Sequence, residues 1–112
     1  MREMVDVTRT LAAMNLEEHV AVVTDGRFSG YSRGAVLGHV CPEAQQGGLI
    51  GLLKNGDIIS FDIGARTIHA DLSAEEIASR RKEWKPKELT CKGYLRRYAK
   101  LVTSACSGAV LE

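Results

Sequence analysis

The spacing of apolar residues changes near residue 73, and this change constrains the fold more than any other feature of the sequence. Before it, segments 58–63 and 67–72 alternate apolar and polar residues, which predicts strands with one buried face. Ser73 then begins a Ser-Ala-Glu-Glu capping box, in which the Ser73 hydroxyl accepts from the Glu76 amide and the Glu76 side chain reaches back. We therefore predict strands directly before residue 73 and helices after it, as in an α+β domain.

Two further segments have the features of strands. The run 49–53 is apolar and is separated from 58–63 by Asn55-Gly56, a pair that favours the tight turn of a β-hairpin. The run 19–24 is rich in β-branched residues, predicts a buried strand and leads into a glycine-rich turn. Residues 31–48 show no period, and we expect irregular structure there with a short helical turn.

Three segments are predicted to be helical. Apolar residues recur at helical spacing over 6–14, where Asp6 is a plausible cap, and over 94–102. The helix that begins at Ser73 should end near Trp84, before Pro86. A chain of 112 residues has room for one domain, 1–112, with a radius of gyration of about 13 Å if compact. The order of elements predicts an α+β domain built on a compact sheet or barrel.

The net charge is close to neutral but is unevenly distributed. Fifteen basic and 14 acidic residues give +1, which favours neither nucleic acid nor an anionic membrane as partner. Residues 1–79 carry −5 and residues 80–112 carry +6, so the basic last third could dock to an acidic surface or simply be solvated. The apolar runs are far too short to cross a membrane and no signal-peptide core is visible, so we expect a soluble, cytoplasmic chain.

The cysteines and histidines do not form a recognisable site. Cys41, Cys91 and Cys106 are odd in number and widely spaced, which matches neither a disulfide framework nor a CxxC-type metal site. We interpret them as three reduced thiols. The three histidines are equally scattered, so any metal or iron-sulfur chemistry needs ligands from elsewhere.

The densest group of reactive side chains lies in residues 25–34. This segment contains two serines, two arginines, a carboxylate and three glycines, so its backbone could approach a ligand closely. Arg27 or Arg33 could bind a carboxylate or phosphate, with Ser29 as a reactive hydroxyl. A solvated connecting loop remains the alternative. Ser29 does not lie in a G-x-S-x-G motif, and its hydroxyl would act as a base only beside a cation.

Several motifs together resemble the C-terminal domain of the dihydroxy-acid and phosphogluconate dehydratase family, and the dihydroxy-acid branch in particular. The resemblance covers essentially the whole chain in order. The motifs that carry it are Met1-Arg2-Glu3-Met4, Val23-Thr24-Asp25-Gly26-Arg27-Phe28-Ser29-Gly30, Arg33-Gly34, Gly38-His39-Val40, Pro42-Glu43-Ala44, Gly47-Gly48, Asn55-Gly56-Asp57 and Tyr98-Ala99-Lys100-Leu101-Val102.

The resemblance implies a hydro-lyase that converts a 2,3-dihydroxy carboxylate to a 2-oxo acid in branched-chain amino-acid biosynthesis. It implies a small β-barrel-like, swivelling-type domain with flanking helices. In the family a larger N-terminal domain carries the iron-sulfur cysteines and most ligands of a Mg²⁺ ion, and the enzyme is a homodimer. This chain would then be inactive alone and would hold neither cofactor by itself. The compartment would be the cytoplasm, or an organelle stroma or matrix in a eukaryote.

The resemblance also implies roles for particular residues. Ser29 falls on the base that removes the C2 proton, Ser29, Gly30 and Ser32 fall on substrate-binding positions, and Glu3 falls on a magnesium ligand. A helix and a strand between them could return Ser29 toward Glu3. Tyr31 departs from the small residue usual there. The alternatives are a non-catalytic interaction module that docks through the basic last third, and a phosphogluconate or sugar-acid dehydratase.

Overall fold

The computed structural model describes residues 3–112 and begins with helix α1 (Val5–Ala13), close to the predicted 6–14. The predicted cap is wrong. Asp6 lies inside the first turn of the helix, where its charge still favours the helix dipole. The side chain that satisfies a free amide is that of Glu3, whose Oε2 accepts from the Val5 amide at 3.0 Å.

Strand β1 (Val22–Val23) pairs in parallel with β2 (Val36–Leu37). The strand predicted over 19–24 is therefore real but shorter, and β2 lies in the segment predicted to be irregular. The pairing extends past β1, because the Thr24 amide donates to Leu37 and the Val40 amide donates to Thr24. A two-residue strand among glycines and small residues has too few positions to show an alternation.

The hairpin predicted between residues 49–53 and 58–63 is wrong, because other segments pair. Residues 49–53 do not form a strand: Leu49–Leu52 is a 3₁₀ helix (η2), preceded by a second one (η1, Ala44–Gln46) in the segment expected to hold a helical turn. The hairpin that exists pairs β3 (Ile59–Asp62) with β4 (Thr67–Ala70). A short apolar run looks the same in a strand and in a buried helical turn, and here the turn is helical.

Both predicted C-terminal helices are present, as α2 (Ala74–Glu83) and α3 (Gly93–Leu101), followed by the 3₁₀ turn η3 (Ala105–Ser107). Half of the capping box is confirmed, since the Ser73 hydroxyl accepts from the Glu76 amide at 3.2 Å. The other half is wrong, because the Glu76 carboxylate accepts from Arg80 Nε at 2.7 Å.

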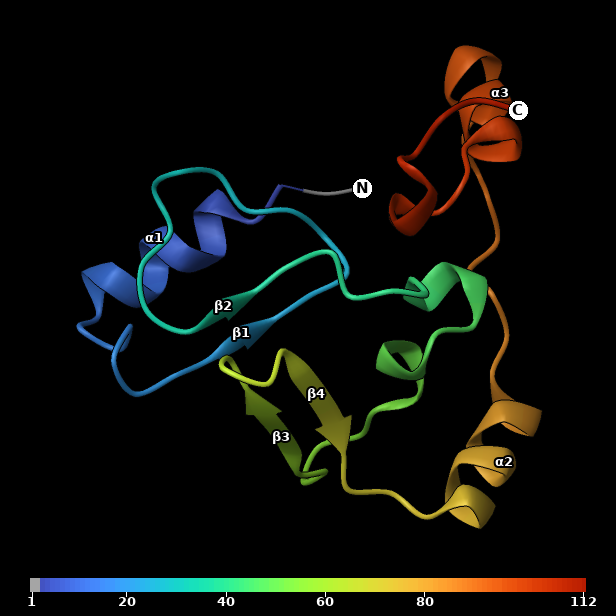
Figure 1. Cartoon of the computed structure of the whole chain (residues 1–112). Coiled ribbons are helices and arrows are strands. Elements are labelled where there is room, and N and C mark those ends of the chain that lie inside the picture. Colours follow the sequence, from blue (N-terminus) through green and yellow to red (C-terminus); the bar gives the residue numbers. More distant parts are fainter. Residues whose placement is uncertain (1–2) are drawn as a thin grey trace.

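The α+β class is confirmed, but the β-barrel-like, swivelling-type form is not. The described residues form two separate two-stranded sheets and no closed barrel. Every strand has one paired neighbour, whereas a barrel needs each strand paired on both sides. Figure 1 shows β1 and β2 beside α1, the β3–β4 hairpin below them, and α3 with the C-terminal turn at the far upper right.

The arrangement leaves an unusually large surface exposed. Among the described residues Leu52 is the one large apolar side chain that is buried. The accessible surface is 8456 Å², against about 6,000 Å² for a compact protein of this mass. The radius of gyration, 15.6 Å, likewise exceeds the 13 Å or so expected of a compact chain. In the part that the structure describes, no helix has both the length and the apolarity needed to span a bilayer.

Candidate functional site

The glycine-rich turn that follows β1 is fixed at two points. Thr24 is buried, and its Oγ1 accepts from the Gly26 amide at 2.9 Å. The Asp25 carboxylate accepts from the Ala44 amide at 2.9 Å, which ties the turn to the start of η1. The base of the turn is therefore held by hydrogen bonds from two parts of the chain, while its tip is free to present side chains.

Ser29 lies at the exposed tip of this turn. Its carbonyl accepts from the Ser32 amide at 3.3 Å, and no hydrogen bond of its hydroxyl is found within residues 3–112. Gly30 next to it is exposed, and a Cβ there would meet nothing within 4 Å. Ser32 is half-buried, and in the described structure its Oγ is a buried atom without a hydrogen-bond partner. The tip of the turn therefore presents the hydroxyl of Ser29 at the surface, while the hydroxyl of Ser32 points inward. The space beside Gly30 is open.

The structure brings Glu3 next to this turn. Glu3 and Arg27 form a parallel β-bridge, in which the Met4 amide donates to the Arg27 carbonyl at 2.9 Å. Arg27 is two residues before Ser29, so the backbone that carries the predicted metal ligand runs beside the backbone that carries the predicted base. The Glu3 side chain is exposed and uses one oxygen for the Val5 amide.

Tyr31, the residue that departs from the expected motif, contacts helix α1. The guanidinium carbon of Arg9 lies 5.9 Å from the centre of the Tyr31 ring, within the range of a cation–π interaction. The ring is 63% exposed. Tyr31 therefore interacts with Arg9 of α1 through the face of its ring.

A cavity of 610 Å³ lies between the turn and the C-terminal segment. Sequence reasoning missed it, because its walls come from both ends of the chain. Met4, Thr24, Asp25 and Gly26 line one side, and Tyr98, Ala99, Thr103 and Ala105 are among the residues that line the other.

Glu43 fastens the two sides of this cavity together. Its carboxylate accepts from the Ser104 hydroxyl at 2.9 Å and from the Ala105 amide at 2.8 Å. Partial burial alone would raise the pKa of Glu43, but the hydrogen bonds from Ala105 and Ser104 outweigh it and hold the pKa below its usual value. In the sequence, the only sign of this role is that Glu43 belongs to Pro42-Glu43-Ala44, one of the motifs that carry the family resemblance. The resemblance itself implies no role for Glu43.

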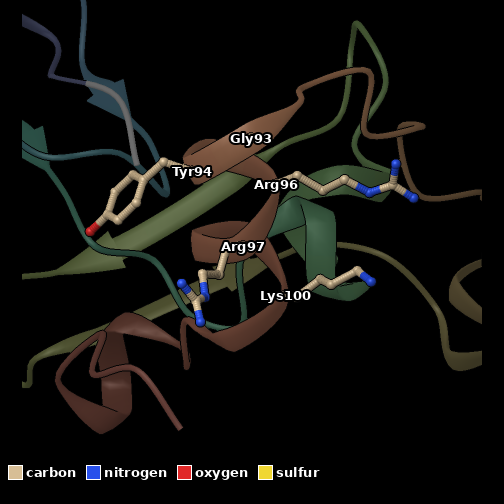
Figure 2. Close-up of a pocket in the computed structure, with 5 residues that line it drawn as sticks. All are labelled: Gly93, Tyr94, Arg96, Arg97 and Lys100. Atoms are coloured by element: carbon tan, nitrogen blue, oxygen red, sulfur yellow. The ribbon is translucent and has the colours of Figure 1, made fainter.

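The outer face of α3 carries three exposed basic side chains of the last third, Arg96, Arg97 and Lys100. An open hollow of 520 Å³ lies among Gly93, Tyr94, Arg96, Arg97 and Lys100. Figure 2 shows Arg96 and Lys100 pointing to one side of the helix, and Tyr94 and Arg97 to the other. Because these cations diverge, they form a charged face and not a set of groups that converge on one small anion.

No group of three or more metal-ligating side chains lies together anywhere in the described residues. Glu3 can supply a single carboxylate oxygen, whereas Mg²⁺ takes six oxygen ligands in octahedral geometry. A Mg²⁺ ion held here would need its other ligands from outside this chain. The three cysteines do not offer the four-ligand set that an iron-sulfur cluster takes.

Comparison with known proteins identifies the family. The family model for the C-terminal part of dihydroxy-acid/6-phosphogluconate dehydratases matches residues 1–109. The dihydroxy-acid dehydratase of Clostridium botulinum (strain Alaska E43 / Type E3) is 57% identical over the whole chain. The enzymes of that name from Moorella thermoacetica and Pyrococcus furiosus are 54% and 53% identical, also over the whole chain. The chain spans 20% of the length of each of these relatives.

Proposed function

Because the chain belongs to the dihydroxy-acid/6-phosphogluconate dehydratase family, as its C-terminal domain, we propose that it completes the active site of a hydro-lyase. The reaction is the dehydration of a 2,3-dihydroxy carboxylate to a 2-oxo acid, in branched-chain amino-acid biosynthesis. Three of the most similar relatives all carry the name dihydroxy-acid dehydratase, which favours this substrate class over a phosphogluconate or sugar acid.

The β-bridge between Glu3 and Arg27 is the observation that supports this proposal most strongly. It holds a carboxylate and the turn of Ser29 at one exposed edge of the domain. A carboxylate that could bind a metal ion, carried on a backbone that runs beside the turn of Ser29, is suited to chemistry on an oxygen-rich substrate. In this proposal the edge faces the larger part of the enzyme, which supplies the remaining ligands.

Glu3 would hold the Mg²⁺ ion through its carboxylate, since a hard divalent cation prefers oxygen ligands. That ion would supply positive potential that favours a deprotonated hydroxyl nearby and would suit a substrate rich in oxygen ligands. No set of cysteines in the described residues fits a cluster, so we assign the iron-sulfur cluster to the rest of the enzyme and derive no step of this chain from it.

Ser29 would act as the base. Its deprotonated Oγ takes the C2 proton of the substrate and the C3–O bond breaks. The departing hydroxide receives the proton that Ser29 has taken, which gives water and restores the deprotonated Oγ. The enol that remains loses its hydroxyl proton and gains one at C3, which gives the 2-oxo acid. Gly30 leaves room for the carbon chain of the substrate beside Ser29, because Gly30 lacks a side chain and its surroundings are open. The unpartnered Ser32 hydroxyl would turn to a substrate oxygen, which would satisfy a buried polar atom.

The larger N-terminal part of the same enzyme is the partner in this proposal. It would cover apolar side chains that are exposed in the chain alone, including Ile63, Leu95 and Leu111. The complete enzyme would be a homodimer in the cytoplasm, or in an organelle stroma or matrix. The charged face of α3 would then be solvated surface, and family membership favours this reading over a separate interaction module.

Turnover of the full-length enzyme tests the proposal. Ser29→Ala should lower the rate of 2-oxo acid formation from a 2,3-dihydroxy acid by at least about 100-fold, because proton removal has lost its base. Ser79→Ala is the matched control, since Ser79 is an exposed serine of α2 far from the turn in sequence, and it should leave the rate unchanged. Undiminished turnover by Ser29→Ala would remove Ser29 from the mechanism. Activity on phosphogluconate in place of the dihydroxy acid would overturn the substrate class.

A further inference from the structure

Cys41 and Cys106 are separated by most of the chain, yet they meet beside the same hydroxyl group. The Ser104 Oγ lies 3.9 Å from the Cys41 sulfur and accepts from the Cys106 amide at 3.3 Å. The position of Ser104 is itself fixed by its hydrogen bond to Glu43. The backbone therefore places one cysteine from the segment after β2 against another from η3.

The Cys41 side chain also acts on the Cys106 thiol. A hydrogen bond with the Cys41 thiol, together with partial desolvation, raises the pKa of the Cys106 thiol. A disulfide forms only between cysteines that the backbone already holds near each other, and here Ser104 contacts both the Cys41 sulfur and the Cys106 amide. Cys106 is exposed, so a small molecule can reach the pair, whereas Cys41 is half-buried behind it.

The third cysteine provides a contrast. Cys91 lies in the segment before α3, is half-buried, and has no sulfur contact in the part of the chain that the structure describes. It therefore has the same chemistry as the other two cysteines but has no sulfur partner among residues 3–112, so it serves as an internal control.

We propose that Cys41 and Cys106 form a reversible disulfide and so make a redox modification site. The oxidant is a low-molecular-weight disulfide. The thiolate of one cysteine attacks it, forming a mixed disulfide and releasing one thiol, and the second cysteine then attacks the protein-bound sulfur and releases the other thiol. The protein loses two protons and two electrons, and the oxidant is reduced to two thiols.

The bond would fasten the C-terminal segment. Cys41 is two residues before Glu43, and Cys106 follows Ala105, so the bond would join the same two segments that Glu43 already links across the 610 Å³ cavity. Covalent closure of so long a loop removes much of the freedom of the open state. Oxidation should therefore slow amide exchange in the segment from Leu101 onward.

Peptide mapping of the full-length protein tests the proposal directly. The protein is equilibrated without oxygen in glutathione and glutathione disulfide, quenched in acid, alkylated and digested with trypsin. Cleavage after Lys and Arg places each cysteine in a separate peptide: 34–54, 88–92 and the peptide that begins at Leu101. We expect the first and third to appear as one disulfide-linked species that dithiothreitol separates, with Cys91 alkylated.

Single cysteine-to-serine variants show which two cysteines form the bond. Cys91→Ser should leave the linked species unchanged, whereas Cys41→Ser and Cys106→Ser should each abolish it and leave the remaining cysteine joined to glutathione. The proposal is overturned if Cys41 and Cys106 of the unmodified protein are alkylated or glutathionylated separately across all redox ratios. It is equally overturned if either cysteine is joined mainly to Cys91 or to a cysteine outside this chain.

Discussion

Glu43 connects segments that are far apart in sequence, and its charge is what holds them. The ionised carboxylate accepts from both Ser104 and Ala105, and these hydrogen bonds lower its pKa. A group with a lowered pKa in the folded state stabilises the protein above its unfolded pKa, and this contribution is lost as the pH falls through the folded value. The attachment of the C-terminal turn should therefore weaken at acid pH.

Hydrogen exchange measures this dependence at residue scale. The amides of η3 should be protected above pH 4.5, the usual value for the Glu43 carboxyl, and should lose protection as the pH falls below it. Glu43→Gln should show weak protection at every pH, because an amide oxygen is a poorer acceptor than a carboxylate. A wild-type η3 whose protection does not change with pH would show that Glu43 does not hold this turn.

Glu3 makes a second prediction at this scale. In the full-length enzyme Glu3→Gln should weaken Mg²⁺ binding by roughly 10- to 100-fold, because an amide cannot replace a charged oxygen ligand. The binding of Mn²⁺ as a spectroscopic substitute measures this directly, apart from activity. Glu18→Gln changes an exposed glutamate outside the turn and serves as control. Equal affinity in the Glu3 variant and the control would contradict the assignment of Glu3.

At the scale of elements, one ion pair attaches α2 to the rest of the domain. Arg80 donates to both carboxylate oxygens of Asp57 and, at 3.1 Å, to the carbonyl of Leu52. The Arg80 and Asp57 side chains are only 10% and 11% exposed. Hydrogen bonds from Arg80 and from the Lys54 amide lower the pKa of Asp57 from 3.8 to about 2.

The pair predicts a specific effect of substitution and of acid. Arg80→Lys should speed amide exchange across α2, because a lysine cannot donate to both carboxylate oxygens and to Leu52 at once. In the wild type the attachment should be complete above pH 3.8 and should weaken as the pH falls toward 2. Arg81→Lys, an exposed neighbour, should have no effect. Equal exchange in both variants would show that packing alone holds α2.

The elements also show which parts of the fold could be predicted from sequence. The helices α2 and α3 were predicted because their spacing and the Ser73 cap are local signals. The turn at Asn55-Gly56 was recognised, and Gly56 does adopt a positive φ of 96°, but it joins a 3₁₀ helix to β3. Which strands pair depends on contacts beyond the turn, and a local signal does not contain that information.

The same distinction applies to the site. Ser29 and Glu3 were identified because they belong to short motifs, and the β-bridge at Arg27 then brings their backbones together. The Glu43–Ser104 and Cys41–Ser104 contacts join residues more than 60 positions apart, and spacing cannot reveal such contacts. The roles of Ser29 and Glu3 remain predictions.

At the scale of the whole molecule, the exposed surface exceeds that of a compact protein by roughly 2,000 Å². An excess of this size matches one side of a large, permanent interface. Made alone, the chain should therefore bind a hydrophobic dye, unfold without a sharp thermal transition and be cut rapidly by protease. The same residues within the full-length enzyme should be protected. A sharp transition and no dye binding by the isolated chain would contradict this account.

The central claim is that Ser29 removes the C2 proton, and isotope exchange tests it most directly. The full-length enzyme is incubated with a dihydroxy acid in deuterated water, and the recovered substrate and the product are examined for deuterium at the former C2–H and at C3. We expect Ser29→Ala to stop release of the C2 proton while Mn²⁺ binding through Glu3 is retained. Release of that proton at the wild-type rate by Ser29→Ala would show that another group is the base.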